Sequence, residues 1–186
     1  PTMKGLSEFI RPRQPYCQYA APIHQIALLY SNEAHKRNSK VVFNNDGLDG
    51  LKGILNALLD GQQTVEVVME HHLHQAMDTY PMIIIPEWNY LQPEFKTELL
   101  TYVERGGKLI VIGPEAVQLF EKESGIQITG KPVVSNTQYL AFGNTMTATA
   151  GPTLPVTLSN KTTPFGKVFV NDDFRDSSAP AASITT

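Results

Sequence analysis

The sequence contains one cysteine, Cys17, among its 186 residues. A single cysteine excludes a disulfide framework within the chain, and it also excludes a zinc site built from cysteine thiolates. Histidine is scarce as well, because all five histidines lie at or before His74. Any catalytic chemistry that needs a histidine from the second half of the chain is therefore absent.

Long apolar runs and clusters of one charge are lacking too. The longest apolar runs have about five or six residues, far below the ~18–20 that a membrane-spanning helix needs. The formal net charge is -3, and Lys and Arg form no cluster that would attract nucleic acid. We therefore expect neither a membrane nor nucleic acid as a partner.

Composition divides the chain into three parts. Residues 1–22 hold several prolines and no sustained period, which is typical of an entry segment or linker. Residues 23–130 are regular, and residues 131–186 are rich in Thr, Gly and Pro with short β-type runs, so that we expect a β-rich or irregular extension with a poorly ordered end. The opening PTMKG and the closing APAASITT favour an excised piece of a longer protein.

Short apolar runs alternate with helical patterns in the regular part. The predicted strands are His24–Ser31, Thr64–Glu70, Pro81–Glu87 and KLIVIG at 108–113. One helix is predicted at 48–61, where leucines and Ile54 share a face and Gly61 follows the end, and another at 91–107, with Phe95, Leu99, Tyr102 and Val103 on one face. Apolar strands that alternate with helices predict an α/β fold with a flavodoxin-like, doubly wound parallel sheet.

Three of these segments together resemble a known family. IALLYS, YPMIIIPEWNYL and YVERGGKLIVIG, in this order and spacing, resemble the class I glutamine amidotransferase-like domain over roughly residues 24–130. The version that they resemble is the β-galactosidase trimerisation domain of Bacteroidetes glycoside hydrolases. The resemblance implies a homo-oligomer, dimer or trimer, beside a catalytic barrel domain, and a periplasmic or extracellular location.

The turn at Gly113-Pro114-Glu115 departs from the catalytic members of that family. In those enzymes the matching turn presents a cysteine nucleophile, with histidine and glutamate arriving from later in the chain. Here Pro114 also lacks the backbone N–H that an oxyanion hole would use. We therefore expect no catalytic residue and no cofactor in this chain, which would be an accessory or oligomerisation domain of a carbohydrate-active enzyme.

Histidines close together in EHHLH are the best candidates for a metal site. His71 and His74 have the i, i+3 spacing that shares a helix face, and His and Glu are good zinc ligands. A solvent-exposed turn explains the same residues. A small metal-dependent hydrolase therefore stays as an alternative.

Carboxylates and aromatic residues follow the predicted strands at the edge where α/β sheets bind ligands. Glu87 and Glu115 would be an acid/base pair if their carboxyl groups were ~5–9 Å apart, or they cap the following helices. Trp88 and Tyr90, with Glu87, would bind a sugar, or they are packing residues. A carboxylate-dependent hydrolase and a sugar-binding module are thus further alternatives.

The segment Asn44–Gly50 has an Asp and Asn content that suggests calcium, but it lacks the spacing of an EF-hand loop. Asp46 or Asp49 as the N-cap of the following helix explains the composition better.

Overall fold

The computed structural model describes residues 2–21, 23–39, 47–171 and 178–186. Its central element is a parallel sheet of strand order β2-β1-β3-β4, with bounds Val65–Met69, Ile26–Tyr30, Met82–Ile85 and Lys108–Val111. All three neighbouring pairs are parallel. The predicted α/β class is confirmed, because each strand is followed by helical structure before the next one begins.

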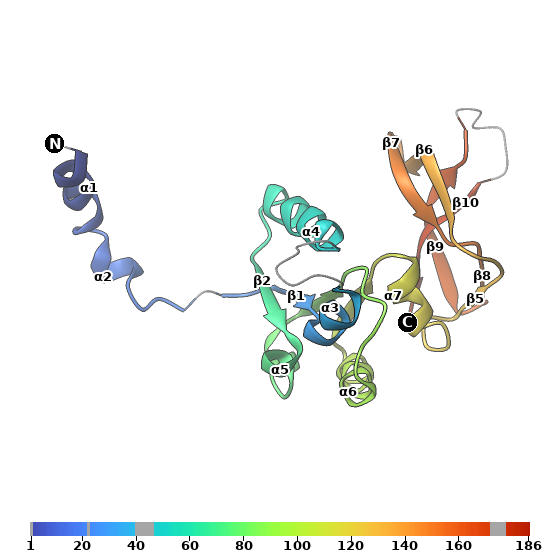
Figure 1. The fold of residues 1–186 in the computed structure, drawn as a ribbon, viewed down its shortest axis with the longest axis horizontal. Helices are drawn as coiled ribbons and strands as arrows, with labels where there is room; N and C mark the ends of the chain where they lie inside the picture. The colour runs from blue at the N-terminus through green and yellow to red at the C-terminus, as the bar shows by residue number, and fades with distance from the viewer. Residues whose placement is uncertain (1, 22, 40–46, 172–177) are drawn as a thin grey trace.

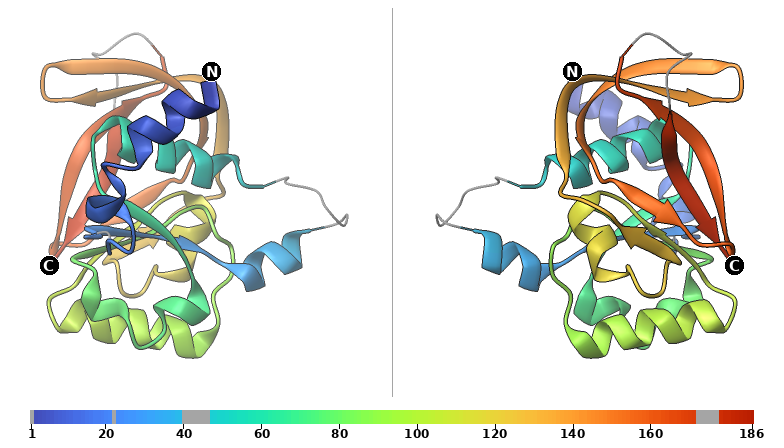
Figure 2. Two further views of the ribbon diagram at one scale, coloured as in Figure 1. Left: turned by 90° about the vertical axis from the view of Figure 1, so that its left-hand side faces the viewer. Right: turned by 90° about the vertical axis from the view of Figure 1, so that its right-hand side faces the viewer.

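Helices cover both faces of this sheet (Figure 1 and Figure 2). Helix α4 (Asp49–Asp60) lies on one face, and α5 (Glu70–Leu73) and α6 (Pro93–Glu104) lie on the other. Helix α3 (Asn32–Asn38), the 3-10 helix η1 (Met77–Thr79) and α7 (Pro114–Leu119) complete the connections. The central strands are accordingly the most buried part of the core, with Ala27, Leu28, Leu29, Ile83 and Ile85 fully enclosed.

Two of the predicted helix faces are narrower than the sequence suggested. On α6, Phe95, Leu99 and Tyr102 are buried, whereas Val103 is exposed. On α4, Leu51 is buried and its apolar neighbours pack partly against the core, but Leu59 is exposed. Each exception lies at the border of its apolar stripe, so that the helix turns the side chain away from the sheet.

The second half of the chain is β structure. Strands β6 (Val133–Phe142), β7 (Thr145–Thr153), β9 (Thr162–Phe169) and β10 (Ala179–Thr185) form an antiparallel sheet of order β10-β9-β6-β7, and β5 (Ile126–Ile128) pairs with β8 (Val156–Leu158). The end of the chain, for which the sequence predicted poor order, thus includes a strand paired with β9. In Figure 1 this sheet stands beside α7.

The start of the chain is also more regular than predicted. Residues 2–21 contain α1 (Thr2–Ile10) and α2 (Gln14–Cys17), which lie at the far end of the molecule from the antiparallel sheet (Figure 1). We call residues 2–21 the N-terminal arm. The proline-rich composition that predicted a linker reflects Pro12 and Pro15, which lie between and within two short helices.

Candidate functional site

The carboxyl edge of the parallel sheet is the place where this fold class binds ligands. In the order β2-β1-β3-β4, the chain adds β2 on one side of β1 and then β3 and β4 on the other side. The ligand crevice of a doubly wound sheet lies at such a switch point, here between β1 and β3. Ser31 follows β1, and Pro86, Glu87 and Trp88 follow β3. These residues decide whether the crevice is open.

Trp88 fills the crevice with its own side chain. The residue is only 5% exposed, and its Nε1–H donates a hydrogen bond of 2.8 Å to the carbonyl oxygen of Leu29 in β1. Its ring meets Tyr30 edge-on, with 5.7 Å between ring centroids. Trp88 therefore bridges β1 and β3 as a packing residue, and its faces are not available to stack on a sugar. Tyr90 is half-buried beneath the guanidinium of Arg37, which lies 3.5 Å from the ring centroid.

Glu87 is exposed and lies over two glycines that leave room for it. A Cβ atom added at Gly113 would lie 2.5 Å from Cγ of Glu87, and one added at Gly50 would collide with its carboxylate. Gly50 belongs to the first turn of α4 and Gly113 is the N-cap of α7. The Glu87 side chain therefore lies at the amino ends of two helices, where their dipoles favour a negative charge. Glu87 thus meets helix ends other than the one predicted, because the helix that follows it in sequence is α6, whose N-cap is Gln92.

Glu115 lies in the first turn of α7 and is exposed. The turn before it is as sharp as the sequence predicted, since Gly113 has φ +92° and Pro114 begins the helix. Pro114 therefore stands where a catalytic elbow would need a nucleophile or a backbone donor.

A buried polar pair that the sequence did not predict lies beside the crevice. The Ser31 hydroxyl donates a short hydrogen bond to Oε1 of Glu70, and it accepts one of 3.1 Å from the amide of Ala34 at the start of α3. Both residues are buried, Ser31 completely. Burial raises the pKa of Glu70, because removal from water penalises the charged carboxylate more than its bond from Ser31 favours it. Ser31 is the N-cap of α3, a role for which serine is a preferred residue and which the strand prediction over His24–Ser31 did not include.

The histidines do not converge on a metal site. The rings of His71 and His72 lie against each other, with centroids 4.0 Å apart, while Nδ1 of His74 lies 2.5 Å from Oε2 of Glu98 in α6. The other Glu98 oxygen accepts a 2.7 Å bond from the amide of Gln75. Among the residues that the structure describes, no three His, Cys, Asp or Glu side chains form a group able to hold a metal ion.

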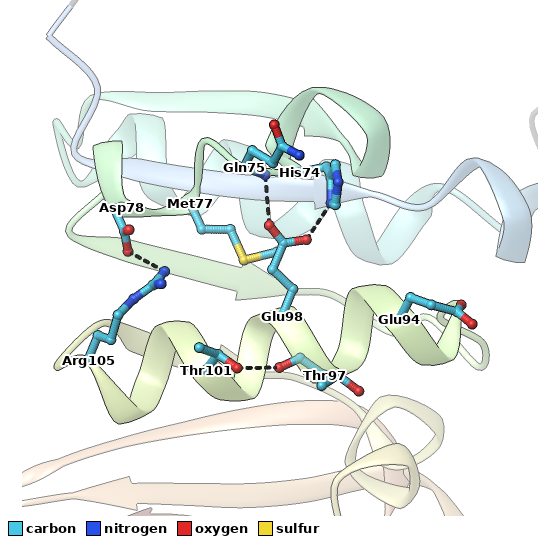
Figure 3. Close-up of a pocket in the computed structure, with 9 residues that line it drawn as sticks. All are labelled: His74, Gln75, Met77, Asp78, Glu94, Thr97, Glu98, Thr101 and Arg105. Carbon is cyan, nitrogen blue, oxygen red and sulfur yellow. Dashed lines mark hydrogen bonds and ion pairs between the residues drawn. The ribbon is translucent and has the colours of Figure 1, made fainter.

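A surface depression of about 430 Å³ lies next to that contact, between α6 and the segment around η1 (Figure 3). Four of its charged groups are paired, His74 with Glu98 and Asp78 with Arg105, whose atoms are 2.9 Å apart, while Glu94 also lines it. The hydroxyls of Thr97 and Thr101 bond to carbonyls of their own helix. A ligand here would have to displace these interactions. Their role is to hold the segment around η1 against α6.

The predicted N-cap of α4 is only partly open to comparison. Asp46 lies outside the described residues. Asp49 is the first residue of α4 and Leu48 is its N-cap, so that Asp49 meets the helix dipole from within the first turn and does not cap it.

No helix in the described part of the chain has the length and apolarity to cross a membrane.

Several solved structures are similar to this chain in fold. No model of a known protein family matches the sequence, and no curated protein sequence matches it. Among solved structures, Gan42B, a GH42 β-galactosidase from G. stearothermophilus, matches 88% of the chain at 16% identity and a TM-score of 0.65. A catalytic mutant of the same enzyme matches 96% of the chain at 14% identity and a TM-score of 0.73. The exo-β-1,4-mannosidase Op5Man5 from Opitutaceae bacterium strain TAV5 matches 88% at 17% identity and a TM-score of 0.59.

The chain is therefore similar in fold to part of these glycoside hydrolases. It spans only 25% to 30% of the length of their chains. At these identities the likeness concerns the fold alone.

Proposed function

We propose that this chain is a non-catalytic accessory domain that helps to assemble a carbohydrate-active enzyme. Within that proposal it is a class I glutamine amidotransferase-like domain of the β-galactosidase trimerisation type, it self-associates as a dimer or trimer, and it works in the periplasm or outside the cell. A neighbouring catalytic barrel would carry the hydrolytic chemistry.

The observation that carries the proposal is the state of the crevice between β1 and β3. The ring of Trp88 occupies it, and the Nε1–H of that ring donates a hydrogen bond to the carbonyl oxygen of Leu29. The adjacent turn has Gly113, Pro114 and Glu115 in place of a nucleophile. A fold that has filled its usual ligand crevice with its own tryptophan is suited to packing and not to turnover.

Both enzyme alternatives are less well supported by the geometry. The metal hypothesis needs His71 and His74 to bind the same metal ion, but Nδ1 of His74 is engaged by Glu98. The carboxylate hypothesis gives Glu87 and Glu115 a catalytic role, whereas the helix dipoles at the amino ends of α4 and α7 already account for both charges. The sugar-binding hypothesis needs an accessible ring at Trp88, which is buried.

Light scattering on the purified chain, with elemental analysis of the same sample, tests the proposal. We expect a mass of two or three chains and less than stoichiometric metal. A monomer that carries one bound metal ion per chain would overturn it. Substitutions of Glu87, Glu115, His71 and His74 would then be assayed for hydrolysis.

The only tryptophan of the chain supplies a second readout. Because Trp88 is buried and its Nε1–H is bonded, its fluorescence should not respond to added galacto- or manno-oligosaccharides. A saturable change in emission from a sample of monomeric mass would instead support the sugar-binding module.

A further inference from the structure

The N-terminal arm exposes an apolar stripe that nothing in the described part of the chain covers. The stripe consists of Met3, Leu6, Phe9 and Ile10, whose exposed fractions lie between 49% and 78%. Their spacing places them on one side of α1. Tyr16, Tyr19 and Ile23 continue the exposed apolar surface toward the body.

Contacts within the arm fix its shape. The Arg13 guanidinium lies 3.8 Å from the centre of the Phe9 ring and donates a 2.7 Å hydrogen bond to the carbonyl oxygen of Phe9. Amides of residues 11, 13 and 14 bond back to carbonyls of the end of α1 and its first following residue. The corner between α1 and α2 is therefore preorganised, which lowers the entropy that binding would cost.

Helix α1 is too short to be stable by itself. It has nine residues, and isolated helices shorter than about 12–15 residues are marginal in water. Helices of this length are usually held by packing of an apolar face, but α1 lies at the far end of the molecule from the antiparallel sheet and apart from the parallel sheet (Figure 1). The stripe thus needs a partner surface.

The comparison with Gan42B bears on the arm. The match to its mutant leaves only 4% of the chain outside it, too little to hold residues 2–21, whereas the match to Gan42B itself leaves 12% outside. The longer match therefore extends into the arm, and 72% of the mutant's chain lies beyond that match. An arm that has a counterpart beside so much additional chain points to an intramolecular partner.

Charge indicates the character of that partner. Residues 1–22 contain Lys4, Arg11 and Arg13 but only one acidic residue, Glu8, in a chain whose net charge is -3. An apolar groove with acidic groups at its rim would complement the stripe and the basic corner.

We infer that the N-terminal arm docks its apolar stripe into an acid-rimmed apolar groove on a neighbouring domain of the same polypeptide. This inference rests on the proposed accessory function and names the surface through which the domain is held. The arm thereby sets the position of the α/β body relative to that neighbour.

Hydrogen exchange read by mass spectrometry tests the inference, on the full-length polypeptide that carries these residues and on the isolated chain of residues 1–186. In the full-length protein the amides of the arm should exchange slower by a factor on the order of 100, because docking suppresses local opening. A double variant, Leu6→Glu with Phe9→Glu, should lose this protection while the sheet keeps its own. The matched control, Gly5→Glu with Gln18→Glu, adds the same charge, places one glutamate where nothing lies near the added side chain, and keeps an acceptor for Gln14 at the other position, so it should keep the protection. Glu is itself a good helix former, so propensity does not explain a loss.

Three results would overturn the inference. The first is an arm that exchanges equally fast in both samples, and the second is a full-length polypeptide without a further domain. The third is protection that rises with protein concentration, which would identify a second copy as the partner. Light scattering on the same samples keeps the two proposals apart. An unprotected arm in an unsubstituted full-length protein of dimer or trimer mass refutes only the docking, whereas a monomer with a protected arm refutes only the self-association.

Discussion

Glu70 is the residue whose environment differs most from what its sequence position suggests. It follows a strand in a polar stretch, where an exposed side chain is the ordinary expectation, yet it is buried beside Ser31. The charges nearest to it, Glu33 and Lys36, act in opposite directions on its pKa and are outweighed by burial. The folded chain therefore holds the Glu70 proton more tightly than the unfolded chain does.

Replacement of Glu70 by Gln should stabilise the protein at neutral pH. A raised pKa means that the contribution of Glu70 is fully favourable in acid and declines as pH rises through the unfolded and then the folded pKa. Glu70→Gln keeps an acceptor for Ser31 and removes this decline. Urea unfolding at pH 4 and pH 8 should give a gain for the variant at pH 8 and little difference at pH 4.

Glu33→Gln is the matched control for that prediction. The bond and the charge of Lys36 lower the pKa of Glu33, so its contribution is present at neutral pH and is lost in acid, the opposite direction. A Glu70→Gln variant that is less stable than the parent at pH 8 would contradict the role assigned to burial.

Trp88 joins two strands through one side chain, and its loss should be felt in the core. Trp88→Phe removes the donor to Leu29 and part of the ring, so we expect the free energy of unfolding to fall by about 1–3 kcal/mol. Tyr90→Phe, which keeps the ring under Arg37, should change it by less than about 0.5 kcal/mol. Chemical denaturation followed by circular dichroism measures both, and equal effects would contradict the bridging role.

Between elements, the link from α6 to β4 depends on a close approach of two residues. The Tyr102 ring lies directly over Gly107, and its hydroxyl donates a 2.9 Å bond to the carbonyl of Tyr80 and accepts one of 3.2 Å from the amide of Lys108. In the sequence, Gly107 is simply the last residue of the helix predicted over 91–107. The structure gives Gly107 the further task of leaving room for a buried tyrosine.

Gly107→Ala should therefore destabilise the fold by about 1–3 kcal/mol, because the added methyl group overlaps the Tyr102 ring and forces it off its bonds. Gly53→Ala, within α4 and with nothing near its added methyl group, should instead stabilise by about 0.5–1 kcal/mol through helix propensity. Thermal unfolding of both variants gives the comparison. A tolerated Gly107→Ala would mean that Tyr102 can move at little cost.

At the scale of the whole molecule, the arm contributes little to the stability of the α/β body. In the described part of the chain, the backbone hydrogen bonds of residues 2–21 stay within the arm, for instance from Tyr16 to Arg13 and from Gln18 to Gln14. The core, in contrast, is made of residues from Ile26 onward.

Deletion of residues 1–21 should leave the stability of the remaining chain nearly unchanged, with a difference below about 0.5 kcal/mol in the free energy of unfolding. Urea unfolding of the isolated chain with and without the arm measures this. A larger loss would show that the arm packs on its own body, and would also count against docking elsewhere.

Sequence alone determined the class of the fold and which residues follow the strands at the carboxyl edge of the parallel sheet. Apolar strands of four to five residues that alternate with amphipathic helices allow few arrangements other than a covered parallel sheet, so β1 to β4, α4 and α6 appear where the pattern predicts them. The absence of a nucleophile at Gly113-Pro114 was equally readable, because it depends on residue type and not on contact.

Tertiary structure alone decided which of the candidate site residues are buried or already engaged by a partner. Trp88 is buried because the crevice between β1 and β3 accepts its ring, His74 is engaged because Glu98 faces it from α6, and Glu70 is enclosed with Ser31. These partners are 59, 24 and 39 positions apart along the chain, and no local period encodes contacts over such separations. Periodicity specifies which side of an element is apolar, whereas only the packed chain brings distant side chains together.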